Sequence, residues 1–121
     1  MSRVERAREL QNRTKKFALR IIKGFSRLPK AEEARVLGRQ FLRSGTSVAA
    51  NYRAACRARS AADFISKIST VAEEADETLF WLELLLEADL VPAKVVGSLL
   101  VECEELVKIF SASPATAKAN R

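Results

Sequence analysis

The segment from residue 61 to residue 88 carries a run of apolar side chains at the three- and four-residue spacing of an α-helix. Its members are Phe64, Ile68, Val71, Ala75, Leu79, Leu82 and Leu86. Such a stripe cannot be shielded from water by its own helix, so it predicts packing against other helices. The C-terminal half of the segment is apolar on almost every side, which predicts cover from more than one neighbour. The side chains responsible are Phe80, Trp81, Leu84 and Leu85.

Three further segments have the same periodicity, and their boundaries carry recognisable signals. The expected helices span about residues 6–27, 31–57, 61–88 and 92–111. Leu28-Pro29 predicts the end of the first helix, because proline disfavours helical geometry in the residue before it. Ser60 with Asp63 three positions on predicts an N-cap, and Pro92 suits the first position of the last helix. The expected inward residues of these three helices are Leu10, Thr14, Phe17, Ile21 and Leu28; Leu37, Phe41, Ser44, Val48, Tyr52 and Ala55; and Val96, Leu99, Cys103, Leu106 and Phe110.

Four helices joined by short connections predict an all-α fold, an antiparallel up-down-up-down four-helix bundle. The chain has 121 residues, which suffices for one modest core, and it contains only 3 Pro and 4 Gly. We therefore expect one bundle domain over residues 1–111. The Ser, Pro, Ala, Thr and Lys residues of segment 112–121 predict a flexible C-terminal tail.

The composition argues against several classes of function. No His is present, and Cys56 and Cys103 lie far apart among apolar neighbours, so we expect reduced thiols, no metal and no cofactor. The acidic group Glu73, Glu74, Asp76 and Glu77 could be a metal cluster, an acid/base pair or a solvated helix face. We favour the solvated face, which could lie opposite a cationic helix of the same or a neighbouring subunit. No apolar run is long enough for a membrane span. We expect a cytoplasmic protein that is not an enzyme and has no membrane partner.

A stretch of small and polar residues occupies positions 40–51, inside the second expected helix. Small residues there let a neighbouring backbone approach closely. Arg43, Ser47 and Asn51 recur at four-residue spacing and form a polar stripe that must find hydrogen-bonding partners. We interpret this stripe, with Trp81, as a structural network or interface between helices or subunits, and a direct functional role is the alternative.

The same stretch carries a family resemblance. The order Gln40, Arg43, Ser47, Val48, Asn51, Ser60, Phe64, Glu77 and Trp81-Leu82 resembles the four-helix bundle proteins encoded by intervening sequences in bacterial 23S ribosomal RNA genes. Relatives of that family include the accessory variability proteins of diversity-generating retroelements. The likeness covers about residues 14–110 and implies a homopentamer, an association with RNA and a reverse transcriptase as a partner. One departure is that Ala54 and Ala55 stand where the family has Glu and Gly.

Charge is distributed unevenly along the chain. Residues 1–60 contain 16 Lys and Arg against 4 Asp and Glu, a balance of +12, whereas residues 61–121 contain 5 against 11, a balance of −6. In the first helix the cations recur at three- and four-residue spacing beside the apolar stripe, as an edge about 20 Å long. The candidate nucleic-acid contacts are Arg13, Lys16, Arg20, Lys23, Arg27, Arg53, Arg57 and Arg59. These cations could bind phosphates or neutralise the acidic third helix, which has too few acids to pair with all of them.

The sequence therefore predicts a basic, oligomeric scaffold that binds structured nucleic acid, most simply RNA, through sequence-independent phosphate contacts. The alternative is a protein-interaction adaptor whose basic face meets an acidic partner without nucleic acid.

Overall fold

Four helices make up the structure of the chain, a computed structural model that describes residues 1–112. They are α1 (Arg3–Ser26), α2 (Glu32–Ala55), α3 (Ala61–Glu87) and α4 (Ala93–Ser111). The described residues contain no strand, so the predicted all-α class is confirmed. The flexible tail was predicted for residues 112–121, of which residues 113–121 lie outside the described part.

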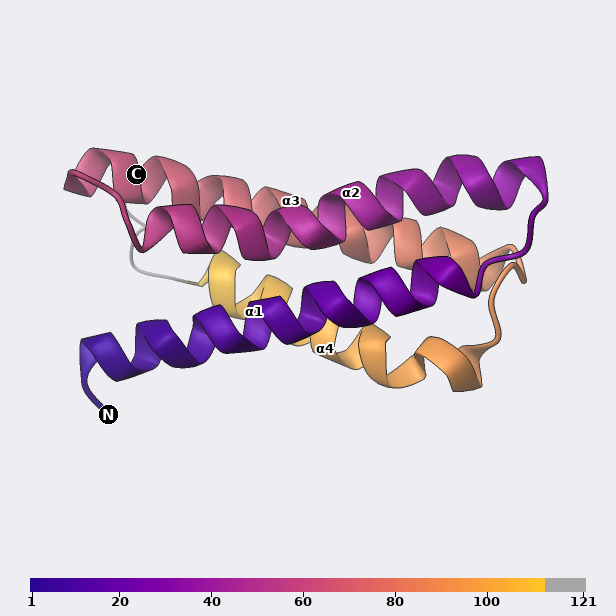
Figure 1. Cartoon of the computed structure of the whole chain (residues 1–121), viewed down its shortest axis with the longest axis horizontal. Coiled ribbons are helices and arrows are strands. Elements are labelled where there is room, and N and C mark those ends of the chain that lie inside the picture. Colours follow the sequence, from indigo (N-terminus) through magenta and orange to yellow (C-terminus); the bar gives the residue numbers. More distant parts are fainter. Residues whose placement is uncertain (113–121) are drawn as a thin grey trace.

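The helices run up, down, up and down, and each packs against its neighbours in the sequence (Figure 1). α2 and α3 pack most extensively, and α1 also reaches α4 to close the bundle. The contact between α1 and α4 is the least extensive of the four. α4 crosses behind α1 at an inclined angle, and the two diverge toward the end where α4 begins (Figure 1).

The helix boundaries lie close to those expected, and local capping explains the differences. α1 begins at Arg3 because the Ser2 hydroxyl accepts a hydrogen bond of 3.1 Å from the backbone N–H of Glu5. Ser60 caps α3 in the predicted way and accepts from the N–H of Asp63 at 3.1 Å. Pro92 occupies the N-cap of α4 itself, one position before the first helical residue.

All four helices contribute to a single apolar core. Its largest fully buried side chains include Phe17, Ile21, Phe41, Val48, Val71, Leu82, Leu85, Leu106 and Phe110. Buried polar side chains are satisfied locally: the Thr14 hydroxyl donates to the Leu10 carbonyl and the Ser44 hydroxyl to the Gln40 carbonyl, each at 2.8 Å. All five expected inward residues of α4 are buried, so that prediction is confirmed.

The predicted stripe of α3 was partly wrong. The buried positions are Ile68, Val71, Ala75, Thr78, Leu82 and Leu85. They alternate steps of three and four residues, whereas the predicted stripe took two consecutive steps of four, from Val71 to Ala75 to Leu79, and therefore shifted onto Leu79 and Leu86. Thr78 can be buried because its hydroxyl donates to the Glu74 carbonyl at 2.7 Å. Phe64 lies in the first turn of α3 and is exposed.

Two glycines of α2 allow α1 to approach closely. A Cβ atom at Gly45 would lie 2.7 Å from two carbons of the Ile21 side chain, and one at Gly38 would lie 2.6 Å from a methyl of Leu28. Both distances are shorter than van der Waals contact. The absence of a side chain at Gly45 therefore lets α1 approach α2 closely, and its absence at Gly38 makes room for Leu28 of the connection between them.

This contact predicts opposite effects for two glycine-to-alanine substitutions. Gly45→Ala should lower the free energy of unfolding by about 1 kcal/mol, because overpacking costs about 1–3 kcal/mol and exceeds the gain in helix propensity. Gly97→Ala is the control, since nothing lies within 4 Å of a Cβ there. It should raise stability by several tenths of a kcal/mol. Urea denaturation measures both, and equal stabilisation by the two substitutions would contradict the close approach.

Candidate nucleic-acid interface

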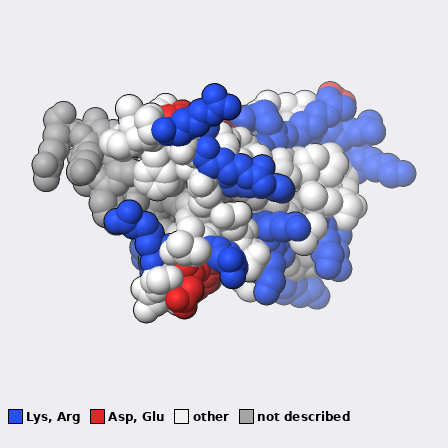
Figure 2. All heavy atoms as spheres, turned by 60° about the vertical axis from the view of Figure 1, so that its left-hand side comes forward, with Lys and Arg blue, Asp and Glu red and all other residues white. Residues whose placement is uncertain are grey.

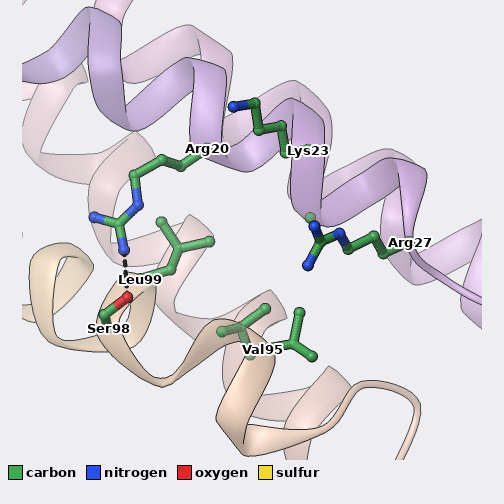
Figure 3. A pocket seen from close by; sticks show the side chains of 8 residues that line it. Arg20, Lys23, Arg27, Val95, Ser98 and Leu99 are labelled. Carbon is green, nitrogen blue, oxygen red and sulfur yellow. Dashed lines mark hydrogen bonds between the residues drawn. The ribbon is translucent and has the colours of Figure 1, made fainter.

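The cationic edge of α1 lies beside its buried face, on the side that meets α4. Phe17 and Ile21 point into the core, whereas Lys16, Lys23 and Arg27 are exposed. Successive helical residues are about 100° apart, so this spacing places the cations along one flank. Figure 3 shows the second half of the edge above the first turns of α4.

Arg13, one of the candidate nucleic-acid contacts, is bound by two carboxylates of α4. Its Nε and Nη2 donate to the two carboxylate oxygens of Glu102 at 2.8 and 2.7 Å, and Nη2 also meets Glu105 Oε2 at 2.6 Å. The guanidinium holds the pKa of Glu102 below its usual range, chiefly through these hydrogen bonds. The same carboxylate raises the pKa of Arg13. Arg13 therefore joins α1 to α4.

The remaining cations of the edge have fewer partners. Arg20 Nη2 donates to the Ser98 hydroxyl of α4 at 2.7 Å (Figure 3). Among residues 1–112, Lys16, Lys23 and Arg27 form no ion pair with any carboxylate. An exposed cation without a carboxylate partner keeps its charge available for an external anion. The edge is thus shorter than predicted, and its available charges lie C-terminal to Arg13.

The predicted cations of the second helix lie at the other end of the bundle. Arg53, Arg57 and Arg59 are exposed where α2 ends and in the connection that leads to α3. Since α1 and α2 are antiparallel, this end is opposite to Arg27. Figure 2 brings this end forward and shows many Lys and Arg side chains with few Asp and Glu. The eight predicted contacts therefore form two groups.

The predicted polar stripe of α2 also divides into two separate sets. Arg43 joins α2 to α3: Nη1 lies 3.1 Å from Glu74 Oε2, and Nη2 donates to Glu77 Oε1. Trp81 Nε1 donates to the same Glu77 oxygen at 3.2 Å. Two of the four side chains of the acidic group of α3, Glu74 and Glu77, thus bind one arginine of α2.

Ser47 and Asn51, by contrast, bond to each other on their own helix. Asn51 Nδ2 donates to the carbonyl of Ser47 at 2.9 Å and to its hydroxyl at 2.8 Å. Neither bonds to Arg43 or to another helix in the described part of the chain. The prediction of one stripe joining helices was therefore too broad, because side chains one turn apart can satisfy each other locally.

Sequence reasoning missed the partners that α4 supplies. Ser98, Glu102 and Glu105 contact α1 from a helix that lies far away in the sequence. Glu102 and Glu105 are three residues apart and therefore lie on the same face of α4. This spacing was the only sign in the sequence that they could bind one partner together. The two carboxylates can bind Arg13 only because packing orients this face of α4 toward α1.

The described residues contain little that suggests covalent or metal chemistry. Cys103 is fully buried, and burial raises the pKa of its thiol to about 12. Within residues 1–112, no group of three or more His, Cys, Asp and Glu side chains is placed to hold a metal ion. None of the four helices is long and apolar enough to cross a membrane.

Comparisons with known proteins identify relatives. The family described as 23S rRNA-intervening sequence protein matches residues 6–112. The chain is also similar to the crystal structure of a protein with unknown function from the S23 ribosomal protein family of Bacteroides thetaiotaomicron. The identity is 35%, the TM-score is 0.77, and the match covers 84% of this chain and 94% of that one. A comparison with curated proteins gives no match.

The ion pair between α1 and α4 predicts a pH-dependent loss of stability in Arg13→Gln. At neutral pH the change should cost about 1 kcal/mol, because the Glu102 side chain is only 18% exposed and loses a two-point contact. The folded pKa of Glu102 is lowered, so the contribution is complete above its ordinary value of 4.5 and disappears as pH falls through the lowered value.

Thermal unfolding of the parent and Arg13→Gln from pH 7 down to about 3 measures this difference. The gap in melting temperature should persist to about pH 5 and then narrow. Lys16→Gln is the matched control on the same edge and should shift stability by less than about 0.5 kcal/mol throughout. If the difference in melting temperature between the parent and Arg13→Gln stays constant down to the lowest pH, the stabilisation by Arg13 does not come from its ion pair with Glu102.

Proposed function

The chain belongs to the 23S rRNA-intervening sequence protein family, and from this premise we propose that it is a non-enzymatic, oligomeric, basic scaffold for structured RNA in the cytoplasm. The observation that carries the proposal is the cationic edge of α1, where Lys16, Lys23 and Arg27 are exposed and have no carboxylate partner among residues 1–112. A net charge of +6 supports attraction to a polyanion.

The arrangement favours contacts to phosphates over the reading of bases. Lys and Arg chains spread along a helix suit the regular phosphates of a folded RNA. Single-stranded RNA is usually recognised by stacking on aromatic rings. Tyr52 and Trp81 are engaged elsewhere: Tyr52 is buried against Phe110 with ring centroids 5.3 Å apart, and Trp81 packs on Phe80 and bonds to Glu77. The exposed rings of Phe64 and Phe80 lie on α3, which does not pack against α1 and its cationic edge. Binding should therefore depend little on RNA sequence.

We also propose that the scaffold is a homo-oligomer. Phe80 is 50% exposed on α3, and its ring centroid lies 5.1 Å from that of the half-buried Trp81. Leu85, which was expected to add to this surface, is instead inside the core. The family resemblance favours a pentamer, which would multiply the field of the cationic edge, and it favours a reverse transcriptase as a protein partner.

Salt dependence of RNA binding tests the function. Lys16→Gln with Lys23→Gln removes two available charges while keeping good helix formers on an exposed face. The double variant should bind every structured RNA more weakly. Each phosphate that a lysine contacts releases about 0.7–0.9 of a counterion, so the loss of two contacts should reduce the slope of log affinity against log salt by about 1.4–1.8. Filter binding at several salt concentrations measures both quantities.

The control removes equal charge from another surface. Arg35 and Arg39 are exposed on α2 and form no ion pair within the described residues. Arg35→Gln with Arg39→Gln should change the salt slope less than the α1 double variant does. If the parent binds no RNA, or if the α1 variant binds with the parent's affinity and slope, the proposal fails. A protein-interaction adaptor with an acidic partner then replaces it.

Assembly is tested separately by light scattering. The parent should give a multiple of the 13.4 kDa monomer mass at micromolar concentration. Phe80→Lys should reduce that mass without unfolding the bundle, because half of the Phe80 side chain is already in water. Val101→Lys, at a position that is 56% exposed on α4, is the control and should keep the parental mass. A monomeric parent would refute the oligomer.

A further inference from the structure

A shallow depression lies between α1 and α4, where the two helices diverge. It encloses about 180 Å³. Its lining residues are Arg20, Lys23, Gly24 and Arg27 of α1 and Val95, Val96, Ser98 and Leu99 of α4. Three of the eight are cationic and none is acidic. The depression is therefore a positively charged hollow with an apolar wall on its α4 side.

Two arginines of α1 flank the mouth of this hollow. In Figure 3 the Arg20 side chain reaches Ser98 of α4 and the Arg27 guanidinium lies above Val95, whereas the Lys23 ammonium points away from α4. Arg20 uses one nitrogen, Nη2, to donate to Ser98 at 2.7 Å. A guanidinium has five N–H donors, so others remain for an incoming oxygen. The bond to Ser98 fixes the orientation of that guanidinium before a ligand arrives.

The α4 side of the depression offers a different chemistry. Val95 is 36% exposed there, and Leu99 is almost fully buried behind it. Aliphatic side chains bind the face of a ribose or a base but offer no hydrogen bond that would select one base. A phosphate alone would leave this wall in water, whereas a nucleoside alone would leave the cations without an anion.

We propose that the depression between α1 and α4 binds a nucleoside phosphate, with the phosphate on the arginines of its α1 side, Arg20 and Arg27, and the nucleoside on Val95 and Leu99. The ligand can be a free nucleotide or an unpaired nucleotide of a bound RNA. In the second case the proposal rests on the proposed function and adds to it: the edge of α1 tracks paired RNA, and the hollow receives a nucleotide outside the duplex. Recognition is independent of the base.

Calorimetry with defined probes tests the site. Adenosine 5′-monophosphate should bind the parent protein with saturation, at least severalfold tighter than inorganic phosphate, and adenosine should not saturate. Val95→Asp places a carboxylate on the apolar wall without removing a cation, and an acid in the first turn of α4 is compatible with the helix. It should weaken the mononucleotide at least tenfold. Val101→Asp adds the same charge outside the depression and should leave this binding unchanged.

A second arm identifies the source of the nucleotide. A blunt RNA duplex is compared with the same duplex carrying a single-stranded overhang. If RNA is the source, the parent should prefer the overhang severalfold, and Val95→Asp should lose that preference while Val101→Asp keeps it. Mononucleotide binding without this preference would identify a free nucleotide as the ligand and still support the site.

The site and the proposed function can fail independently. If the parent binds duplex RNA with the expected salt slope but shows no mononucleotide binding, the site is refuted and the scaffold function stands. The site is also refuted if the Val95→Asp variant binds the mononucleotide as tightly as the parent protein does. If the mononucleotide binds as described but no RNA does, the site stands and the scaffold function is refuted.

Discussion

The close packing of α1 on α2 is the constraint on which the rest of the structure depends. Gly38 and Gly45 admit the side chains of Leu28 and Ile21 where any larger residue would meet them. Because Ile21 must face α2 and the core, the rotation of α1 about its axis is determined. That rotation turns the cationic flank toward α4. A buried apolar contact therefore decides where the exposed charge of α1 is presented.

The positions of the acids leave part of the cationic edge available. Glu102 and Glu105 meet Arg13, while Glu74 and Glu77 meet Arg43. Four acidic side chains thus bind only two arginines, and each group joins two helices that adjoin in the bundle. Lys16 and Lys23 form no ion pair with any carboxylate in the described part of the chain. Net charge alone does not reveal such an arrangement, because it counts acids without locating them.

Much of the fold was predictable, because helix formation and burial leave a local signal. The buried positions of α4 were all anticipated, since every third or fourth residue there is apolar and the others are mostly not. The prediction was weaker in α3, where apolar residues lie on nearly all sides and periodicity cannot choose among them. There Thr78 is buried and Leu79 only partly so. Neighbouring helices, together with a local hydrogen bond, made that choice.

The candidate site followed from the sequence only in part, for a related reason. The sequence alone determined that α1 carries cations on one flank, because residue spacing on a helix sets their direction. It equally determined the Ser60 cap of α3. Only the tertiary structure decided that Arg13 is paired, that Asn51 bonds within its own helix, and that Arg20 meets Ser98 beside a hollow. Those contacts depend on the rotation and separation of helices far apart in the chain, which packing sets and periodicity does not encode.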